Sequence, residues 1–179
     1  MEPQAEATPP RHCDVLVIGG GPAGSTVAPL LTEMGYEVVL LDKARHPRFH
    51  IGESLLPANL PLFERLGVGD EVRAIGMQKW GAEFVSPHHD HKQAFHFAEA
   101  WDKAMPYAYQ VKRAEFDTVL IRNAARKGVA VHEGCKVRSV DFLPADGGAV
   151  VRARHDDGRE EEWQARFVVD ASGRDTFLA

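Results

Sequence analysis

The chain has 179 residues, 44% hydrophobic and 26% charged, which is typical of one soluble globular domain and excludes a wholly disordered chain. Its 26 acidic residues outnumber 21 basic ones, and the formal net charge of -5 argues against a broad nucleic-acid-binding surface. The sequence has no signal peptide and no apolar run long enough to span a membrane. Its two cysteines are too few for a disulfide framework or a zinc site made of thiolates. Together these features predict a cytoplasmic protein.

The first part of the chain predicts a disordered leader followed by a β-α-β unit. Residues 1–12 hold three prolines and no periodic apolar face, which is typical of a leader outside the fold. The apolar run at 14–18 ends in glycines, as a strand buried on both faces does. Residues 22–34 predict a helix, with Pro29 causing a bend, and the apolar stretch 36–42 predicts a second, parallel strand.

The next stretch is rich in proline, histidine and charge. Residues 43–58 are too polar and too long for a simple connection, so they predict a loop that carries function. Two short helices are expected afterwards, around residues 60–66 and 70–75, each ended by a glycine.

Strands dominate the second half of the chain. Residues 79–85 and 93–101 alternate apolar and polar side chains around a turn at 86–92, which indicates antiparallel strands. Residues 113–128 predict an amphipathic helix, because acidic residues occupy its first turn and basic residues its last. Further strands are expected at 129–134, 136–143, 149–154 and 161–173.

The strongest motif is a glycine fingerprint between the first strand and the first helix. Gly19 permits a tight turn, Gly21 lets the backbone approach a pyrophosphate, and Gly24 allows close packing of helix on strand. Asp42, at the end of the second strand, is suited to accept hydrogen bonds from a ribose diol. The alternative is a glycine-rich turn without a ligand. The fingerprint does not separate FAD from NAD. RFVVDASG at 166–173 resembles the strand and turn that many flavoproteins place beside FAD, and this resemblance, together with the fingerprint, favours FAD; by itself DASG is an ordinary strand end and turn.

These elements predict an α/β fold: a Rossmann-type FAD-binding β-α-β domain with an inserted antiparallel β region. The chain resembles an N-terminal fragment of a larger flavoprotein, because it stops just after a strand. The predicted divisions are a leader (1–12), the β-α-β unit with a flavin-side loop (13–78), antiparallel substrate-side strands (79–111) and the remainder of the FAD-binding domain (112–179).

Three stretches resemble the flavin-dependent halogenases, within a larger group that includes aromatic hydroxylases and geranylgeranyl reductases. They are GGGPAGSTVAPLLTEMGYEVVLLDKARHPRFHIGESLLP at 19–57, YAYQVKRAEFDTVLIRNAARKGVAVHEGCKV at 107–137, and DASGRD at 170–175. The resemblance covers nearly everything after the leader. Two halogenase features, a W-x-W-x-I-P segment and a later Gly-Asp turn, do not occur in these residues.

The resemblance implies a set of FAD contacts. Family members commonly carry Glu where this chain has Asp42, a shorter side chain that keeps the ribose acceptor. For Arg113 the alternative is a solvated residue at a helix start. The implied contacts are Gly19, Gly21, Ala23 and Gly24 with the pyrophosphate, Asp42 with the adenosine ribose, Arg113 with a flavin phosphate or ribose, and the backbone of Val137 with the adenine.

The resemblance also implies a catalytic lysine. Lys79 aligns with the lysine that family members place between flavin and organic substrate, where it holds or carries the halogen oxidant. Without the family match, a solvated surface lysine is the simpler interpretation. Relatives acting on phenols and pyrroles often continue with Trp-Gly after this stretch, whereas Phe84 is followed by Val85 and Ser86, so the substrate type stays open.

The segment HIGESLLP corresponds to a family signature that runs near the flavin. Gly52 allows close approach there, and Ser54 either serves this segment or caps the following helix.

Two further features have simpler explanations than metal binding or catalysis. His88, His89, Asp90 and His91 contain metal-ligand types, but neighbouring residues rarely converge on one ion, so a hydrated turn is predicted. Cys135 lacks an activating neighbour apart from the following lysine and is interpreted as structural.

The resulting hypothesis is the FAD-binding part of a flavin-dependent halogenase, with this stretch alone expected to be inactive. Its implied partners are a small aromatic substrate, free or carrier-bound, a halide and a separate flavin reductase, with no nucleic acid or membrane span. The alternatives are an FAD-dependent aromatic hydroxylase or geranylgeranyl reductase-like oxidoreductase, and a degenerate, non-catalytic nucleotide-binding module.

Overall fold

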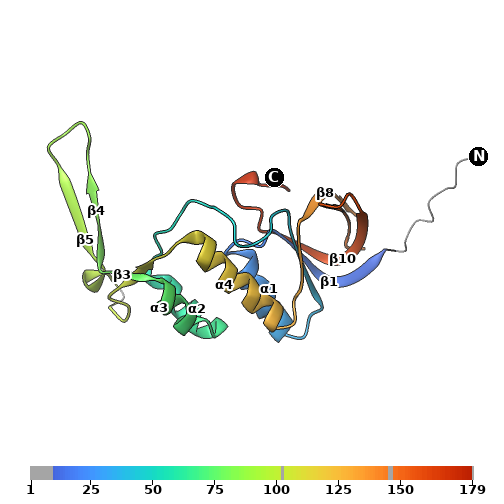
Figure 1. The fold of residues 1–179 in the computed structure, drawn as a ribbon, viewed down its shortest axis with the longest axis horizontal. Helices are drawn as coiled ribbons and strands as arrows, with labels where there is room; N and C mark the ends of the chain where they lie inside the picture. Colours follow the sequence, from blue (N-terminus) through green and yellow to red (C-terminus); the bar gives the residue numbers. More distant parts are fainter. Residues whose placement is uncertain (1–9, 102, 145–146, 179) are drawn as a thin grey trace, which may run out of the picture. The chain divides into compact units, whose positions relative to one another are not determined.

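The computed structural model describes residues 10–101, 103–144 and 147–178 (Figure 1). The chain forms two compact units: unit 1 holds the described residues of Met1–Arg48 and Leu120–Ala179, and unit 2 is Phe49–Val119. This division differs from the predicted one, because residues 49–78 belong with the strands that follow them rather than with the β-α-β unit.

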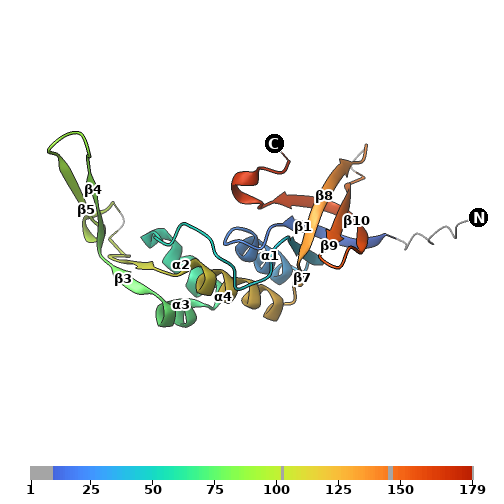
Figure 2. The ribbon, with the colours of Figure 1, turned by 45° about the horizontal axis from the view of Figure 1, so that its top comes forward.

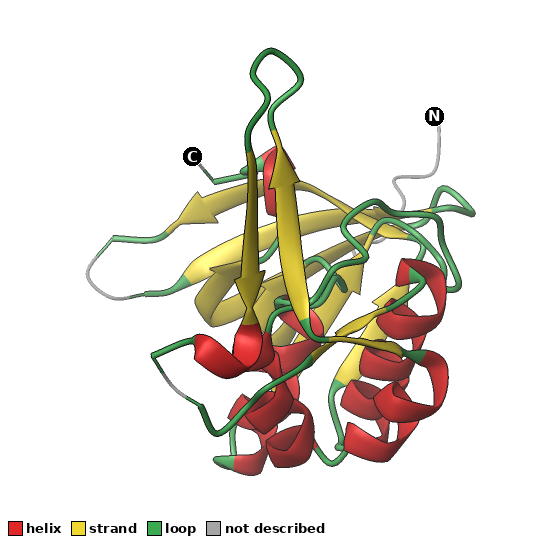
Figure 3. Cartoon of the chain, turned by 90° about the vertical axis from the view of Figure 1, so that its left-hand side faces the viewer, coloured by secondary structure: helices red, strands yellow, loops and turns green. Residues whose placement is uncertain are grey.

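Unit 1 is built on a mixed sheet, whose strands are among those drawn yellow in Figure 3. In the described part of the chain its order is β7-β2-β1-β10-β9-β8. Strands β7, β2, β1 and β10 run parallel to one another, whereas β9 runs antiparallel to β10 and β8 antiparallel to β9. The α/β prediction is therefore confirmed. The strands are β1 (Arg11–Ile18), β2 (Val38–Asp42), β7 (Ala130–Glu133), β8 (Cys135–Phe142), β9 (Ala149–His155) and β10 (Glu160–Asp170).

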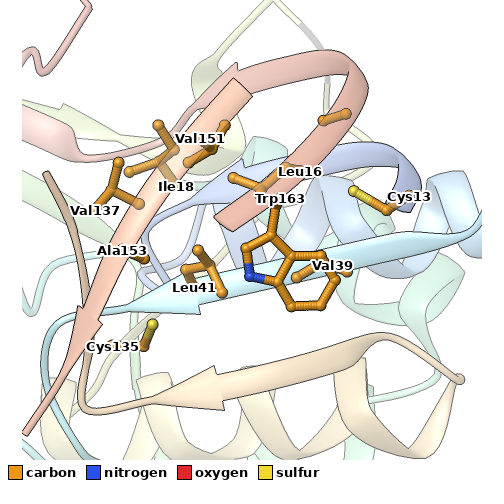
Figure 4. Close-up of a cluster of buried hydrophobic side chains, with 11 residues drawn as sticks. Cys13, Leu16, Ile18, Val39, Leu41, Cys135, Val137, Val151, Ala153 and Trp163 are labelled. Carbon is orange, nitrogen blue, oxygen red and sulfur yellow. The ribbon is translucent and has the colours of Figure 1, made fainter. Parts of the chain in front are cut away.

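The apolar runs of β1 and β2 reflect burial on both faces. Val15 and Val17 pack in a cluster with side chains of helices α1 (Gly24–Glu33) and α4 (Arg113–Arg126). Leu16 and Ile18 belong to a second cluster that includes Trp163 and side chains of β8 and β9 (Figure 4). Alternate residues of one strand thus support two hydrophobic clusters, which explains why the sequence shows a continuous rather than an alternating pattern.

Two boundaries differ from prediction at the start of the chain. Strand β1 begins at Arg11, so Arg11 and His12 belong to the sheet and not to a leader, because Arg11 pairs with Trp163. The rest of the predicted leader, apart from Pro10, lies outside the described residues. Helix α1 begins at Gly24, with Pro29 inside it.

Unit 2 contains the two short helices and two small antiparallel sheets. Strands β4 and β5 form the predicted hairpin (Figure 2), but β5 ends at His96, where a 3₁₀ turn follows. The pairing of β3 with β6 was not predicted. The elements are α2 (Leu60–Leu66), α3 (Gly69–Ile75), β3 (Met77–Lys79), β4 (Gly81–Val85), β5 (Lys92–His96) and β6 (Ala108–Gln110). No helix in the described residues is long and apolar enough to span a membrane.

Backbone hydrogen bonds explain why the predicted loop belongs to unit 2. Leu55 N–H donates to Tyr109 O at 3.0 Å, and Val111 N–H donates to Glu53 O at 2.9 Å. These bonds join the loop to residues more than 50 positions away, which a reading of local sequence patterns does not detect.

Candidate functional site

The first and third glycines of the fingerprint are required by the backbone. Gly19 has a φ of +103°, and a Cβ there would lie 2.5 Å from Ala171 O. A Cβ on Gly24 would lie 1.9 Å from Gly19 O. A larger residue at either position would have to displace main chain, so the turn between β1 and α1 depends on both glycines.

The turn has open space at Gly21, the second glycine, and unpaired backbone N–H groups around it. A Cβ on Gly21 would meet only Arg48 Nη2, at 3.6 Å. Within the described chain, Gly21, Ala23 and Gly24 donate their backbone N–H groups to no other residue, whereas Ser25 N–H donates to Gly21 O at 2.9 Å. Free N–H groups at the positive end of a helix favour a phosphate. These residues therefore fit the pyrophosphate of the predicted dinucleotide.

Asp42 ends β2 directly beside this turn and is only 4% exposed. Its Oδ2 accepts the Gly20 N–H at 2.6 Å, and its Oδ1 accepts the Ala44 N–H at 2.7 Å. Each carboxylate oxygen keeps further acceptor capacity, so a ribose diol can still be bound. The sequence predicted this ribose role, but not that Asp42 also fixes the glycine turn.

Sequence reasoning missed a cation at the same place. Arg48 Nη2 lies 3.8 Å from Asp42 Oδ2, and Arg48 Nε donates to His46 Nε2 at 3.2 Å. His46 is held in turn by Glu133, whose Oε1 lies 2.7 Å from Nδ1. The guanidinium therefore lies near Gly21, where it favours an anionic ligand. Its only signal in the sequence was its place in the loop expected to carry function.

The DASG turn lies against the glycine turn. Ile18 and Asp170 are partners in the parallel pairing of β1 with β10, and Ala171 N–H donates to Ile18 O at 2.9 Å. Asp170 accepts the N–H groups of Ser172 at 2.9 Å and Leu178 at 2.8 Å. Burial opposes ionisation of Asp170, but the bonds from Ser172 and the backbone dominate and lower its pKa. The two motifs that the sequence treated as partners are thus neighbours.

In unit 2, the predicted catalytic lysine contacts the family signature loop. Lys79 Nζ donates a hydrogen bond to Ser54 Oγ and lies 5.4 Å from the centroid of the Phe97 ring. Partial burial lowers the pKa of Lys79. The helix-cap alternative for Ser54 is wrong, because its hydroxyl binds the lysine and the following 3₁₀ turn uses Leu56 as its N-terminal cap position.

The same loop lines an open depression of about 470 Å³. Its walls are residues 49–54 and Gln110, and Ser54 forms an isolated backbone bridge to Gln110. The loop thus presents polar and aromatic side chains around a concave surface within unit 2.

Arg113 is an anchored side chain, not a solvated one. Its Nε and Nη2 lie 2.8 and 3.0 Å from the carboxylate oxygens of Asp117, whose side chain is fully buried. Its Nη1 donates to Ile51 O at 2.7 Å. A Cβ on Gly52 would lie 3.1 Å from the same nitrogen. Arg113 therefore holds the signature loop, and its predicted contact with a flavin phosphate or ribose stays a prediction.

The remaining predicted residues occupy ordinary positions. Val137 is buried in β8, next to a register shift between Val137 and Ser139, and its adenine contact stays a prediction. His88, His89 and His91 are exposed between β4 and β5, which agrees with a hydrated turn. Cys135 is 1% exposed, and burial is the main cause that raises its pKa to about 11, as expected for a structural thiol.

Comparison with known proteins identifies the class of this fold and site. A family model described as "FAD binding domain" matches residues 12–178. The chain belongs to this family of FAD-binding domains.

The relatives of this chain are flavin-dependent halogenases, which confirms the resemblance. The chain is 39% identical to the tryptophan 2-halogenase of Chondromyces crocatus over 178 residues, covering 95% of this chain and 32% of that protein. It is 33% identical to the 1H-pyrrole-2-carbonyl-[peptidyl-carrier protein] chlorinase of Pseudomonas fluorescens, covering 92% of this chain and 40% of that protein. The chain therefore spans well under half the length of these relatives.

Solved structures of related flavoproteins share the fold of this chain. The myxobacterial chondrochloren halogenase superposes with a TM-score of 0.84 at 42% identity, over 93% of this chain and 38% of that one. A flavoprotein/dehydrogenase from Cytophaga hutchinsonii superposes with a TM-score of 0.85 at 36% identity, over 94% of this chain and 41% of that one.

Proposed function

We propose that this chain is the FAD-binding part of a flavin-dependent halogenase that acts on an electron-rich aromatic substrate. The observation that carries the halogenase assignment is the bond from Lys79 to Ser54 of the signature loop. It holds one amine at one position in a partly buried environment, whereas a surface lysine samples many positions.

FAD binding rests on unit 1. The free N–H groups of Gly21, Ala23 and Gly24 and the guanidinium of Arg48 supply donors and positive charge for the pyrophosphate. Asp42 supplies the ribose acceptor. When bound, reduced FAD supplies the reaction with oxygen that oxidises a halide.

Lys79 is the proposed catalytic residue. Its ammonium group would donate a hydrogen bond to the halogen oxidant, fixing and polarising it before transfer to an aromatic ring. A separate flavin reductase would supply reduced FAD. The relative whose name specifies a carrier-bound pyrrole makes a carrier-bound aromatic acid one candidate substrate.

A second candidate function is an FAD-dependent hydroxylase or reductase. The observation in its favour is the similarity to a solved flavoprotein/dehydrogenase, which shares the fold to the same degree as the halogenase structure. Such an enzyme would use the same cofactor residues and would not require halide.

FAD binding is tested on the chain itself by following quenching of flavin fluorescence. We expect Gly21→Val to abolish binding, because its side chain would enter the space left for the pyrophosphate, while Gly158→Asn in the β9–β10 turn leaves binding unchanged. Equal affinity of both variants would contradict the assigned cofactor site.

Halogenation is tested in a chimera of the Chondromyces tryptophan 2-halogenase in which this chain replaces the matching region. With a flavin reductase, oxygen and chloride, we expect chlorinated tryptophan, lost in Lys79→Ala and kept in the control Lys92→Ala on the hairpin. A chimera that binds FAD but gives a hydroxylated, halide-independent product, or halogenates without Lys79, would overturn the proposal.

A further inference from the structure

A polar cluster in unit 1 contains none of the residues assigned above to the cofactor. It combines His132 of β7, His155 at the end of β9, and Glu161 near the start of β10. Their ligand atoms all lie within 4.8 Å of one another. His132 precedes His155 by more than 20 positions, and the fold of the sheet brings both close to Glu161.

The carboxylate of Glu161 is the central member. Its side chain is 7% exposed, and Oε1 lies 2.6 Å from Arg159 Nη1 and 3.3 Å from Arg11 Nη2. Its other oxygen, Oε2, is buried and has no hydrogen-bond partner among the described residues. Nε2 of His155 lies 2.8 Å from Oε2, which is the distance of an ion pair when His155 is protonated. One oxygen is thus oriented by two arginines, while the other faces the imidazole nitrogen of His155.

We propose that His132, His155 and Glu161 form a binding site for a divalent metal ion of the zinc class. Two imidazoles and one carboxylate are a common ligand set for Zn²⁺. Metal–ligand lengths of about 2.0–2.1 Å place the ligand atoms of a tetrahedral ion about 3.3 Å apart, so small side-chain movements close the site.

The surroundings fit this ligand set. The arginines bind Oε1, so Oε2 is the oxygen that faces the two imidazoles, and hydrogen bonds to a ligating carboxylate orient it in the same way in metal sites. The ring of His132 packs edge-on against Trp163, with centroids 5.5 Å apart, which fixes its orientation.

A sulfur atom lies next to the same cluster. Cys135 Sγ is 3.6 Å from His155 Nε2. The ion would join β7 to the β8–β9–β10 meander, so its role would be to stabilise unit 1.

The test must separate this cluster from the exposed histidines of the hairpin turn. We would therefore replace His88→Ala, His89→Ala and His91→Ala together and titrate this hairpin variant with Zn²⁺ by calorimetry. We expect one Zn²⁺ per chain and a higher Tm with metal. Absence of stoichiometric binding in the hairpin variant would overturn the proposal.

Ligand substitutions in the same background identify the site. We expect Glu161→Gln and His132→Asn each to weaken Zn²⁺ binding at least tenfold, while the control Asp156→Asn, in the neighbouring exposed turn, leaves it unchanged. Circular dichroism checks that each variant is folded. Unchanged binding in both ligand variants would refute the site.

One measurement needs no change to the cluster. X-ray absorption at the zinc edge of the hairpin variant should show scattering from two imidazole rings. A spectrum without imidazole scattering would refute the site even if the ligand variants failed to fold.

Discussion

Lys79 Nζ donates a hydrogen bond to Ser54 Oγ, so a residue of β3 is fixed to a loop 25 positions earlier in the chain. The loop is itself fixed by Arg113, whose guanidinium binds both the carbonyl of Ile51 and the buried carboxylate of Asp117. The position of the amine thus depends on three side chains that sequence patterns treat separately.

The first prediction concerns the acidity of Lys79. Since burial already lowers its pKa below 10.5, and the Ser54 hydroxyl accepts a hydrogen bond from the ammonium form, Ser54→Ala should lower the pKa further. In Ser54→Ala we expect Lys79 to be acylated faster than in the unchanged chain, with Lys112 as the internal reference. Competitive labelling and mass spectrometry across a range of pH measure both rates. An unchanged labelling profile in Ser54→Ala would show that the hydroxyl does not influence the amine.

Two glycines of the fingerprint should respond differently to alanine. Gly24→Ala places a Cβ against Gly19 O and should cost about 1–3 kcal/mol of unfolding free energy or more. Gly21→Ala meets only the end of Arg48 at 3.6 Å, so stability should change by less than about 0.5 kcal/mol while FAD affinity falls. Denaturant unfolding measures the change in stability, and flavin titration measures the change in FAD affinity. A clear loss of stability in Gly21→Ala would contradict the prediction that this position has open space.

Asp42 should affect both stability and cofactor affinity. Asp42→Asn replaces one acceptor by an amide donor facing the N–H of Gly20 or Ala44, and we expect a loss of about 1–3 kcal/mol of unfolding free energy. The matched control is Asp141→Asn, because Asp141 forms an ion pair with Arg152 that is exposed to solvent and therefore contributes little to stability. Equal stability of the two variants would mean that Asp42 does not fix the turn.

The turn after β10 should loosen in acid. The pKa of Asp170 is lowered in the folded state, so its contribution is present above the unfolded pKa of 3.8 and is lost as pH falls through the lower folded value. The amide resonances of Ser172 and Leu178 should therefore titrate with a midpoint below 3.8, and Asp170→Asn should abolish this titration. A midpoint at or above 3.8 would show that the bonds to Asp170 do not favour its ionised form.

The sequence predicted the elements with strong periodicity and the motif between them. Strands β1 and β2 are continuous apolar runs, and α4 has a clear amphipathic pattern, so their type and approximate bounds follow from local residues. Strands β3 and β6 have three residues each, too few to show a period, and were missed.

Contacts between distant residues explain the rest of what was missed. Arg48 and Ser54 lie in a loop without periodicity, and their importance follows from partners that only the fold brings close. The same holds for His132, His155 and Glu161, whose proximity depends on the register of three strands.

Strand β10 pairs with β9 through Ala165 and with β1 from Arg11 to Ile18, so it is held on both sides. One extra residue inserted after Arg166 would turn every later side chain of β10 to the opposite face of the sheet. It would also move Asp170 by about 3.3 Å along the strand. Ala171 would then no longer lie against Gly19. The length of this strand is therefore as strict a requirement for the glycine turn as the glycines themselves, and a change in chain length is tolerated only before the strand, in the turn between β9 and β10.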